Sequence, residues 1–184
     1  MKSKKVIALI GPIASGKGTA ADFFSKKGFK QITMSNFLRT EARKRKVKPD
    51  RKYFRKLQAE LRKEFGPNIL VEKAIEKIKN SKEEKFVIDG LRDYREAKFA
   101  KRKLKLKIIF IDASPYVRYQ RQKQRARHGF SDTYQEFLHE DARENAIFDF
   151  HKTMKLADFR VFSDGGREDL HKQLAKLYGK LGIK

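Results

Sequence analysis

The 184-residue sequence contains no cysteine and no tryptophan, and only four prolines. Without cysteine the chain can form neither a disulfide nor a thiolate metal site, and a reducing cytoplasm is the expected location. No apolar run reaches the roughly 18 residues that a membrane span needs, so no membrane partner is expected. No long linker rich in Pro, Gly or Ser divides the chain, which predicts a single domain over residues 1–184, as a monomer or homodimer.

Acidic residues are scarce relative to basic ones: 23 Asp and Glu stand against 46 Lys and Arg, for a formal net charge of +23. Twelve of the basic residues fall between Arg39 and Lys63, together with only three acids. Such a surface attracts polyanions, so nucleic acid is one predicted class of partner. A lysine-rich or salt-adapted surface without a dedicated partner would explain the overall charge equally well.

Short apolar segments alternate with helical patterns along the chain. Strands are predicted at 6–10, 31–33, 86–88, 108–111 and 160–162. Helices are predicted at 17–26, 51–65, 69–78, 94–104, 115–126, 133–150 and 167–181. This alternation predicts an α/β fold with a five-stranded parallel sheet and helices on both faces. Ligands in such folds bind beyond the carboxyl ends of the strands, here after residues 10, 33, 88 and 111.

A glycine-rich segment follows the first predicted strand and opens the first helix. It runs Gly11-Pro12-Ile13-Ala14-Ser15-Gly16-Lys17-Gly18-Thr19. Gly11 and Gly16 lack a Cβ atom, so the loop can turn tightly and point its N–H groups inward. Together with the helix N-terminus, these donors predict a phosphate-binding loop (P-loop), and Lys17 would span the β- and γ-phosphate oxygens.

A second polar segment, Asp89-Gly90-Leu91-Arg92, follows the third predicted strand. A carboxylate at the tip of a buried strand is costly unless it meets a cation, a metal shell or hydrogen bonds. Beside the P-loop, Asp89 could orient Mg²⁺ or its water ligands. We expect Arg92 to reach the transferred phosphoryl group or its acceptor.

These motifs resemble those of adenylate kinases and other nucleoside monophosphate kinases. The P-loop ends Gly-Lys-Gly-Thr, the segment 32–39 is similar to the acceptor-binding segment of that family, and 89–92 is a shorter form of its Asp-Gly-Phe-Pro-Arg motif. Thr133, Phe137, Asp141, Arg143 and Glu144 add a resemblance to archaeal-type P-loop kinases labelled nucleotide kinase-like or dephospho-CoA kinase-like. The resemblance implies a three-layer P-loop NTPase fold with a helical acceptor-binding insert at about 35–80 and a short lid at about 121–145.

The resemblance also implies roles for individual residues. ATP would be bound by Gly11, Ala14, Ser15, Gly16, Lys17, Gly18, Thr19 and Arg121. The acceptor nucleotide would be bound by Ser35, Arg39, Asp89 and Arg92. Catalysis would fall to Lys17, Arg92 and Arg125, and Mg²⁺ to Asp89 and, through water, to Thr19. The glutamine that reads adenine in adenylate kinases has no clear counterpart, Glu96 being nearest in sequence.

A row of arginines occupies the predicted helix after the fourth strand. Arg118, Arg121 and Arg125 are spaced by three and four residues and so share one face. Arginines that close over a substrate expel water and stabilise transition-state charge. Arg127 and Arg143 are further candidates, and the segment 127–132 is too short and lacks the cysteines for a zinc-bound lid. The four histidines show no metal spacing and are expected at the surface.

Four functions remain open from the sequence. The first is ATP-dependent transfer to a nucleoside monophosphate, which needs no base because the acceptor phosphate is already nucleophilic. A dephospho-CoA kinase-like enzyme would attack through a hydroxyl and would benefit from a base, but Asn36 stands where an aspartate is expected. The basic stretch also allows a nucleic-acid-binding ATPase or end kinase, and the loop alone allows a nucleotide sensor.

Overall fold

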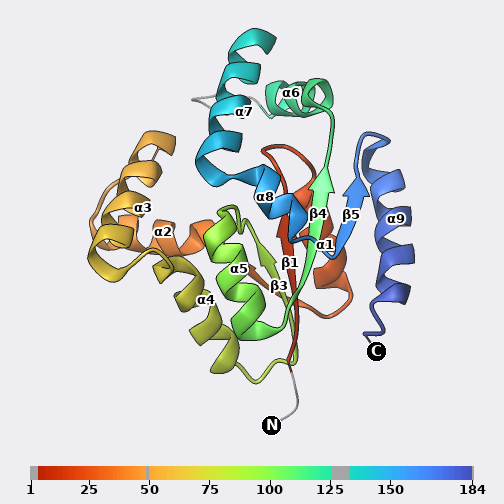
Figure 1. The fold of residues 1–184 in the computed structure, drawn as a ribbon, viewed down its shortest axis with the longest axis horizontal. Coiled ribbons are helices and arrows are strands. Elements are labelled where there is room, and N and C mark those ends of the chain that lie inside the picture. Colours follow the sequence, from red (N-terminus) through yellow and green to blue (C-terminus); the bar gives the residue numbers. More distant parts are fainter. Residues whose placement is uncertain (1–3, 49, 126–132, 184) are drawn as a thin grey trace.

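Five strands lie side by side in one sheet in the computed structural model, which describes residues 4–48, 50–125 and 133–183 (Figure 1). They are β1 (Lys5–Ile10), β2 (Lys30–Thr33), β3 (Lys85–Asp89), β4 (Lys107–Asp112) and β5 (Phe159–Phe162). Their order is β2-β3-β1-β4-β5, and every pairing is parallel. The predicted five-stranded parallel sheet is therefore confirmed.

Helices cover both faces of the sheet. The described helices are α1 (Lys17–Lys26), α2 (Met34–Lys44), α3 (Arg51–Phe65), α4 (Ile69–Lys79), α5 (Tyr94–Leu104), α6 (Pro115–Gln124), α7 (Tyr134–Phe148), α8 (Phe150–Lys155) and α9 (Gly166–Lys180). One face packs against α2, α4, α5 and α8, and the other against α1 and α9. α6 and α7 stand beyond the carboxyl ends of β1 and β4 (Figure 1).

Alternation along β1 explains the two layers. Ala8 and Ile10 point into the cluster that contains Val71 of α4, while Ile7 and Leu9 point into the cluster that contains Phe24 of α1. All four β1 side chains are fully buried. A strand that is apolar on both faces is typical of the middle of a parallel sheet, and β1 lies there between β3 and β4. The loop after β1 is therefore anchored to the buried centre of the sheet.

Two features of the helices differ from the prediction. The single helix expected at 133–150 is wrong, because the chain breaks at Asp149, whose φ of 51° is left-handed, and α8 begins immediately afterwards. Aspartate tolerates that conformation better than most residues. α2 was not among the predicted helices, yet it buries Met34, Leu38 and Ala42 at helical spacing.

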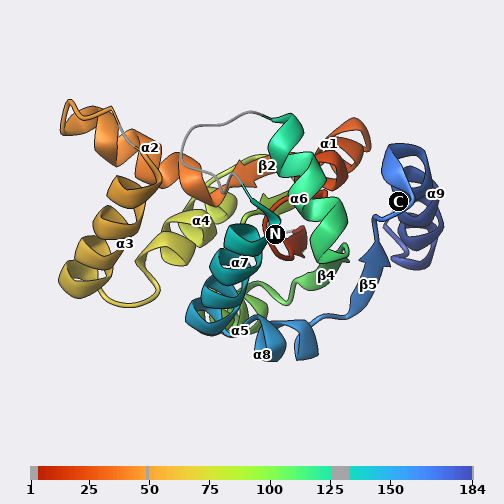
Figure 2. The same cartoon turned by 90° about the horizontal axis from the view of Figure 1, so that it is seen from above.

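α2 and α3 extend from the β2 end of the sheet and form an arm beside its carboxyl edge (Figure 2). Leu57 and Leu61 of α3 are buried and join the arm to the same apolar cluster as α4. Asp50 caps α3 by accepting a hydrogen bond from the Tyr53 amide at 2.6 Å. Within the described ranges, no helix combines the length and apolar character needed to cross a membrane.

Candidate active site

The loop from Gly11 to Gly16 joins β1 to α1 and has a backbone that only glycine permits at two points. Gly11 has φ +154°, and a Cβ there would lie 2.1 Å from the Ile111 carbonyl oxygen. Gly16 has φ +100°, and its Cβ would lie 3.2 Å from Leu170. Ala14 also adopts a left-handed φ of 58°. These conformations turn the loop tightly against β4 and α9, as the sequence predicted for a P-loop.

The N-terminus of α1 is suited to an anion. No side chain of the described residues caps its Gly16 N-cap, and its first turn contains no acid. Ser15 is fully buried, and its Oγ lacks a hydrogen-bond partner among the described residues. Amides at a helix start and a buried hydroxyl without a partner fit a phosphate group. Gly18 and Thr19 lie in the same first turn, where they were expected.

Lys17 is buried beside this loop. Its amine donates hydrogen bonds to the carbonyl oxygens of Gly11 at 2.8 Å and Pro12 at 2.6 Å. Burial and, to a smaller extent, the charge of Arg92 lower the pKa of Lys17 to about 7, although Asp89 and Glu144 oppose the shift. The Lys17 amine therefore lies close enough to Asp89 and Arg92 for their charges to affect its pKa. A phosphate there would restore the full charge of the lysine.

Asp89 stands at the tip of β3, next to Leu9 of β1 and Thr33 of β2 in the sheet register. The Gln31 side chain donates a hydrogen bond to it at 3.4 Å. Burial raises the pKa of Asp89, although Lys17 and Arg92 pull it down. A half-buried carboxylate with a raised pKa, close to two cations, can bind a metal-bound water or accept a proton.

Arg92 is held by α7. Its Nη1 lies 3.4 Å from Glu144 Oε2 of α7, and its guanidinium lies 5.9 Å from the centre of the Phe148 ring. The Arg92 side chain keeps 34% of its surface exposed, while that of Glu144 keeps 10%. The Arg92 guanidinium is therefore partly accessible to solvent, whereas its carboxylate partner is buried.

Arg118 forms a buried ion pair that joins α6 to α7. Its Nη1 and Nη2 donate to the two carboxylate oxygens of Asp141 at 2.5 and 2.7 Å. Its Nε donates to the Ala113 carbonyl at 3.0 Å, and Nη1 reaches the Ile13 carbonyl of the P-loop at 3.5 Å. Arg118 is thus a structural brace between the phosphate loop and α7, and not a mobile arginine.

Arg121 reaches the P-loop through Ser163, which follows β5. Arg121 Nη1 donates to Ser163 Oγ at 2.8 Å and to the Ala14 carbonyl at 3.4 Å, and Nη2 donates to the Ser163 carbonyl. The Ser163 hydroxyl in turn donates to the Ser15 carbonyl at 2.6 Å. The turn after β5 therefore supports the loop from behind.

The other predicted arginines are exposed or lie outside the described residues. Arg39 is exposed, and its Nη1 donates to Ser35 Oγ at 2.9 Å and to Asn36 Oδ1 at 3.1 Å, within its own helix. Arg125 is exposed at the end of α6, and Arg143 is exposed on α7. Arg127, His128 and the rest of the segment 126–132 lie outside the described residues.

Glu96, the residue nearest in sequence to the missing adenine-reading glutamine, lies in a buried ion pair. It is 3% exposed, and Arg62 of α3 donates to it at 2.9 Å. Burial raises the pKa of Glu96 against the opposing effect of Arg62. The pair fastens α3 to α5.

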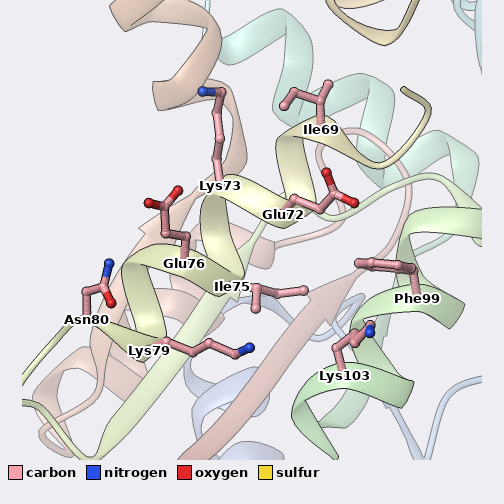
Figure 3. A pocket seen from close by; sticks show the side chains of 9 residues that line it. All are labelled: Ile69, Glu72, Lys73, Ile75, Glu76, Lys79, Asn80, Phe99 and Lys103. Carbon is pink, nitrogen blue, oxygen red and sulfur yellow. The ribbon is translucent and has the colours of Figure 1, made fainter. Parts of the chain in front are cut away.

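A pocket of about 490 Å³ lies elsewhere, between α4 and α5 (Figure 3). Ile75 and Phe99 point toward one another across it, while Glu72, Lys73 and Glu76 stand around it. Its lining includes none of the predicted site residues. We base the candidate site on the P-loop geometry instead, because phosphate sites are made by backbone amides and cations in open clefts.

Three residues that support the site were given no role from the sequence: Asp141, Glu144 and Ser163. Asp141 and Glu144 follow the buried Phe137 at helical spacing, so periodicity alone would have placed two acids on the inner face of α7. Buried acids require cationic partners, and the sequence offers Arg92 and the arginines of the helix predicted at 115–126. No such signal exists for Ser163, whose partner Ser15 is 148 residues away.

The comparisons with known proteins agree with this geometry. A family model described as an AAA domain matches residues 10–139. A UPF0200 protein of Methanothermobacter thermautotrophicus is 31% identical over 180 residues, covering 97% of this chain and 92% of that protein. Another UPF0200 protein, from Pyrococcus horikoshii, is 29% identical and covers 96% of this chain and 97% of its own.

Solved structures with the same fold include two shikimate kinases. That of Bacteroides thetaiotaomicron has a TM-score of 0.63 at 17% identity, over 97% of this chain and 99% of its own. That of Acinetobacter baumannii, solved with shikimate, has a TM-score of 0.63 at 15% identity, over 100% and 97%. This chain therefore shares the α/β P-loop kinase fold of these two proteins. The chain belongs to the AAA-domain family and to the UPF0200 proteins.

Proposed function

We propose that this chain transfers the γ-phosphoryl group of ATP to a nucleoside monophosphate and releases the two diphosphates. The observation that carries the proposal is the meeting of Lys17, Asp89 and Arg92 beside an uncapped helix start. Phosphoryl transfer depends mainly on positioning and on neutralising charge, and these groups supply both.

The donor phosphates would lie against the amides of Ala14, Ser15, Gly16, Gly18 and Thr19. Lys17 would leave the carbonyls of Gly11 and Pro12 for the β- and γ-phosphate oxygens. Arg121 already contacts the loop and would line the donor side. Arg125, exposed at the end of the same helix, would turn toward the γ-phosphate when the lid closes.

The donor set also fits a magnesium ion that takes most of its ligands from phosphate and water. Asp89 offers a hard carboxylate oxygen at the strand end, and Thr19 would act through a bound water. Among the described residues no group of three or more acidic or histidine side chains could hold a metal ion. The ion would neutralise phosphate charge, and Asp89 would orient its water shell.

The acceptor phosphate would lie between Arg92 and Arg39. Arg92 would exchange Glu144 for the phosphate, and Arg39 would leave Ser35 and Asn36, which are exposed partners in its own helix. Arginine binds phosphate through two parallel N–H groups, so both exchanges gain charge-assisted hydrogen bonds. Ser35 would remain at the same site as a hydroxyl ligand.

A hydroxyl acceptor is the second candidate, and the raised pKa of Asp89 favours it. A carboxylate that holds its proton more tightly is a stronger base toward a hydroxyl group. The structural neighbours named shikimate kinase and the resemblance to dephospho-CoA kinase-like proteins support the same alternative. In that case Asp89 would accept the hydroxyl proton as the new O–P bond forms and the bond to ADP breaks.

The test is a coupled assay of ADP release over all ribo- and deoxyribonucleoside monophosphates, dephospho-CoA and shikimate. We expect one class to raise ADP release, and Lys17→Ala to lower the rate by at least about 100-fold. Lys26→Ala, an exposed lysine on the same helix, is the matched control and should leave the rate unchanged. If no acceptor raises ADP release, or if Lys17→Ala stays active, the proposal fails.

The two acceptor classes are separated by Asp89→Asn. With a hydroxyl acceptor the wild-type rate should rise with pH as Asp89 loses its proton, and Asp89→Asn should lose that dependence. With a monophosphate acceptor, the rate of Asp89→Asn should depend on pH as the wild-type rate does.

A further inference from the structure

The arm made by α2 and α3 carries a large excess of positive charge on its outer surface. Nine exposed Lys and Arg side chains belong to it, and we call them the basic arm: Arg39, Arg43, Lys44, Arg45, Lys46, Lys48, Arg55, Lys56 and Lys63. The arm stands apart from the body of the molecule at the β2 end of the sheet (Figure 2). It therefore presents its charge to solvent over several directions.

Three of the four acids of the arm, Glu41, Asp50 and Glu60, are engaged within it, and the fourth, Glu64, is exposed on α3. Glu41 and Glu60 both bind Arg45, at 3.2 and 2.8 Å. The Asp50 carboxylate caps α3. Glu41 also lies 3.8 Å from Lys44, and Glu60 lies 3.9 Å from Lys56, so these acids compensate only the cations nearest to them.

Besides Arg39, which hydrogen-bonds within α2, five members of the basic arm form no ion pair with any residue of the described ranges: Arg43, Lys46, Lys48, Arg55 and Lys63. Like charges held at this density repel one another in water. A polyanion relieves that repulsion and releases its own condensed counterions, which favours association.

We propose that the basic arm binds nucleic acid through its phosphate backbone. A lipid surface is disfavoured because an interfacial helix needs an exposed apolar face. Here Leu38, Ala42, Leu57 and Leu61 are all turned into the core. The large apolar side chains exposed on the arm are Val47 at 38% and Phe65 at 54%, and they lie at opposite ends of it.

The basic arm begins where β2 ends, because α2 starts directly after Thr33, which pairs with Asp89 in the sheet. Arg39 lies in the second turn of α2, with its guanidinium 6.0 Å from the centre of the Phe54 ring. Arginine and aromatic side chains together suit a phosphate next to a base. A bound strand would thus run along the arm toward the carboxyl edge of the sheet. The inference does not require that the enzyme transfer a phosphoryl group.

The test uses fluorescence anisotropy of the full chain with a labelled single-stranded DNA and with the corresponding duplex. Five phosphate contacts predict that affinity falls by roughly 100-fold or more between about 50 and 200 mM salt. The variant Arg43→Glu/Lys46→Glu/Lys48→Glu should flatten the slope of log affinity against log salt by about 3, one unit for each contact.

A matched variant separates the arm from net charge. Lys172→Glu/Lys176→Glu/Lys180→Glu makes the same charge change on exposed positions of α9, at the other end of the sheet (Figure 1). We expect it to keep the wild-type salt slope. An equal loss in both variants would overturn the proposal, because net charge alone would then account for binding.

Two further measurements complete the experiment. Anionic phosphatidylserine vesicles should bind more weakly than DNA, and tighter binding that the arm variant abolishes would overturn the proposal in favour of a lipid. Arg43→Gln/Lys46→Gln/Lys48→Gln should lose affinity as well, though less than the glutamate variant. Lys17→Ala should bind DNA as the wild type does, so a failure of the kinase proposal would be recognised separately.

Discussion

Lys17 donates to two carbonyl oxygens of its own loop, and burial sets its pKa near the physiological pH. A bound phosphate would raise that pKa, so nucleotide binding should take up a proton on Lys17 above pH 7. We expect isothermal titration calorimetry in buffers of different ionisation enthalpy to detect this uptake between about pH 7 and 9. Lys17→Arg, which stays charged, should bind without it; the same uptake in that variant would exclude Lys17 as its source.

The same shift affects the stability of the free protein. The pKa of Lys17 is about 7 when folded against an ordinary value of 10.5, so the unfolded chain binds more protons between these values. The contribution of Lys17 to the free energy of unfolding therefore rises with pH across that window. Below pH 7 the buried lysine is charged in both states, and its desolvation opposes folding.

Gly11 and Gly18 provide a matched pair within the loop. Gly11→Ala would force a Cβ against the Ile111 carbonyl at a φ that side chains rarely adopt. We expect a loss of about 2–3 kcal/mol in the free energy of unfolding, since the backbone must shift. Gly18→Ala meets no atom within 4 Å and lies in a helix, so it should be neutral or stabilising. Urea denaturation measures both, and equal effects would refute the tight packing at Gly11.

At the scale of elements, the Arg118–Asp141 pair joins α6, α7 and the P-loop. The two side chains are only 4% and 8% exposed. Asp141→Asn leaves a buried arginine without its charge partner, so we expect unfolding to become easier by about 3–5 kcal/mol. Asp149→Asn breaks an exposed pair with Lys152 and should leave the free energy of unfolding nearly unchanged. If chemical denaturation shows equal losses in the free energy of unfolding, the buried pair between α6 and α7 contributes no more than the exposed one.

Element positions were largely predictable where spacing and flanking residues agreed. α3 occupies 51–65 as predicted, because its apolar residues repeat at 3, 4 and 4 and Gly66 ends it. The break at Asp149 was not predictable, since Phe148 and Phe150 continue the apolar pattern across it. Side-chain partners across the fold, such as Ser163 with Ser15, depend on tertiary packing that local patterns do not contain.

At the scale of the whole molecule, alternating strands and helices were sufficient to predict the parallel sheet and the edge where the motifs meet. Which cations face one another across that edge was not predictable. Arg118 and Arg121 share a helix face, yet one braces Asp141 and the other contacts Ser163. That division follows from where α7 and β5 lie, which no spacing in α6 encodes.

The net charge of +23 should also weaken the folded state at low ionic strength. The Debye length shrinks from about 30 Å at 0.01 M to about 8 Å at 0.15 M salt, which screens repulsion across the molecule. We expect calorimetry to show Tm rising by at least about 3 °C over that range, or roughly 1 kcal/mol for a chain of this size. The glutamate variant of the basic arm should show a smaller rise, and an unchanged or falling Tm would contradict the expectation.

The support that Ser163 and Leu170 give to the glycine loop has a consequence for shortened forms of the protein. Both residues lie beyond position 139, where the match to the family model stops. A fragment cut to the matched region would keep every residue of the glycine motif but would lose the side chains against which Gly16 packs. Such a fragment should therefore bind a phosphate ligand at the glycine loop more weakly than the full chain does.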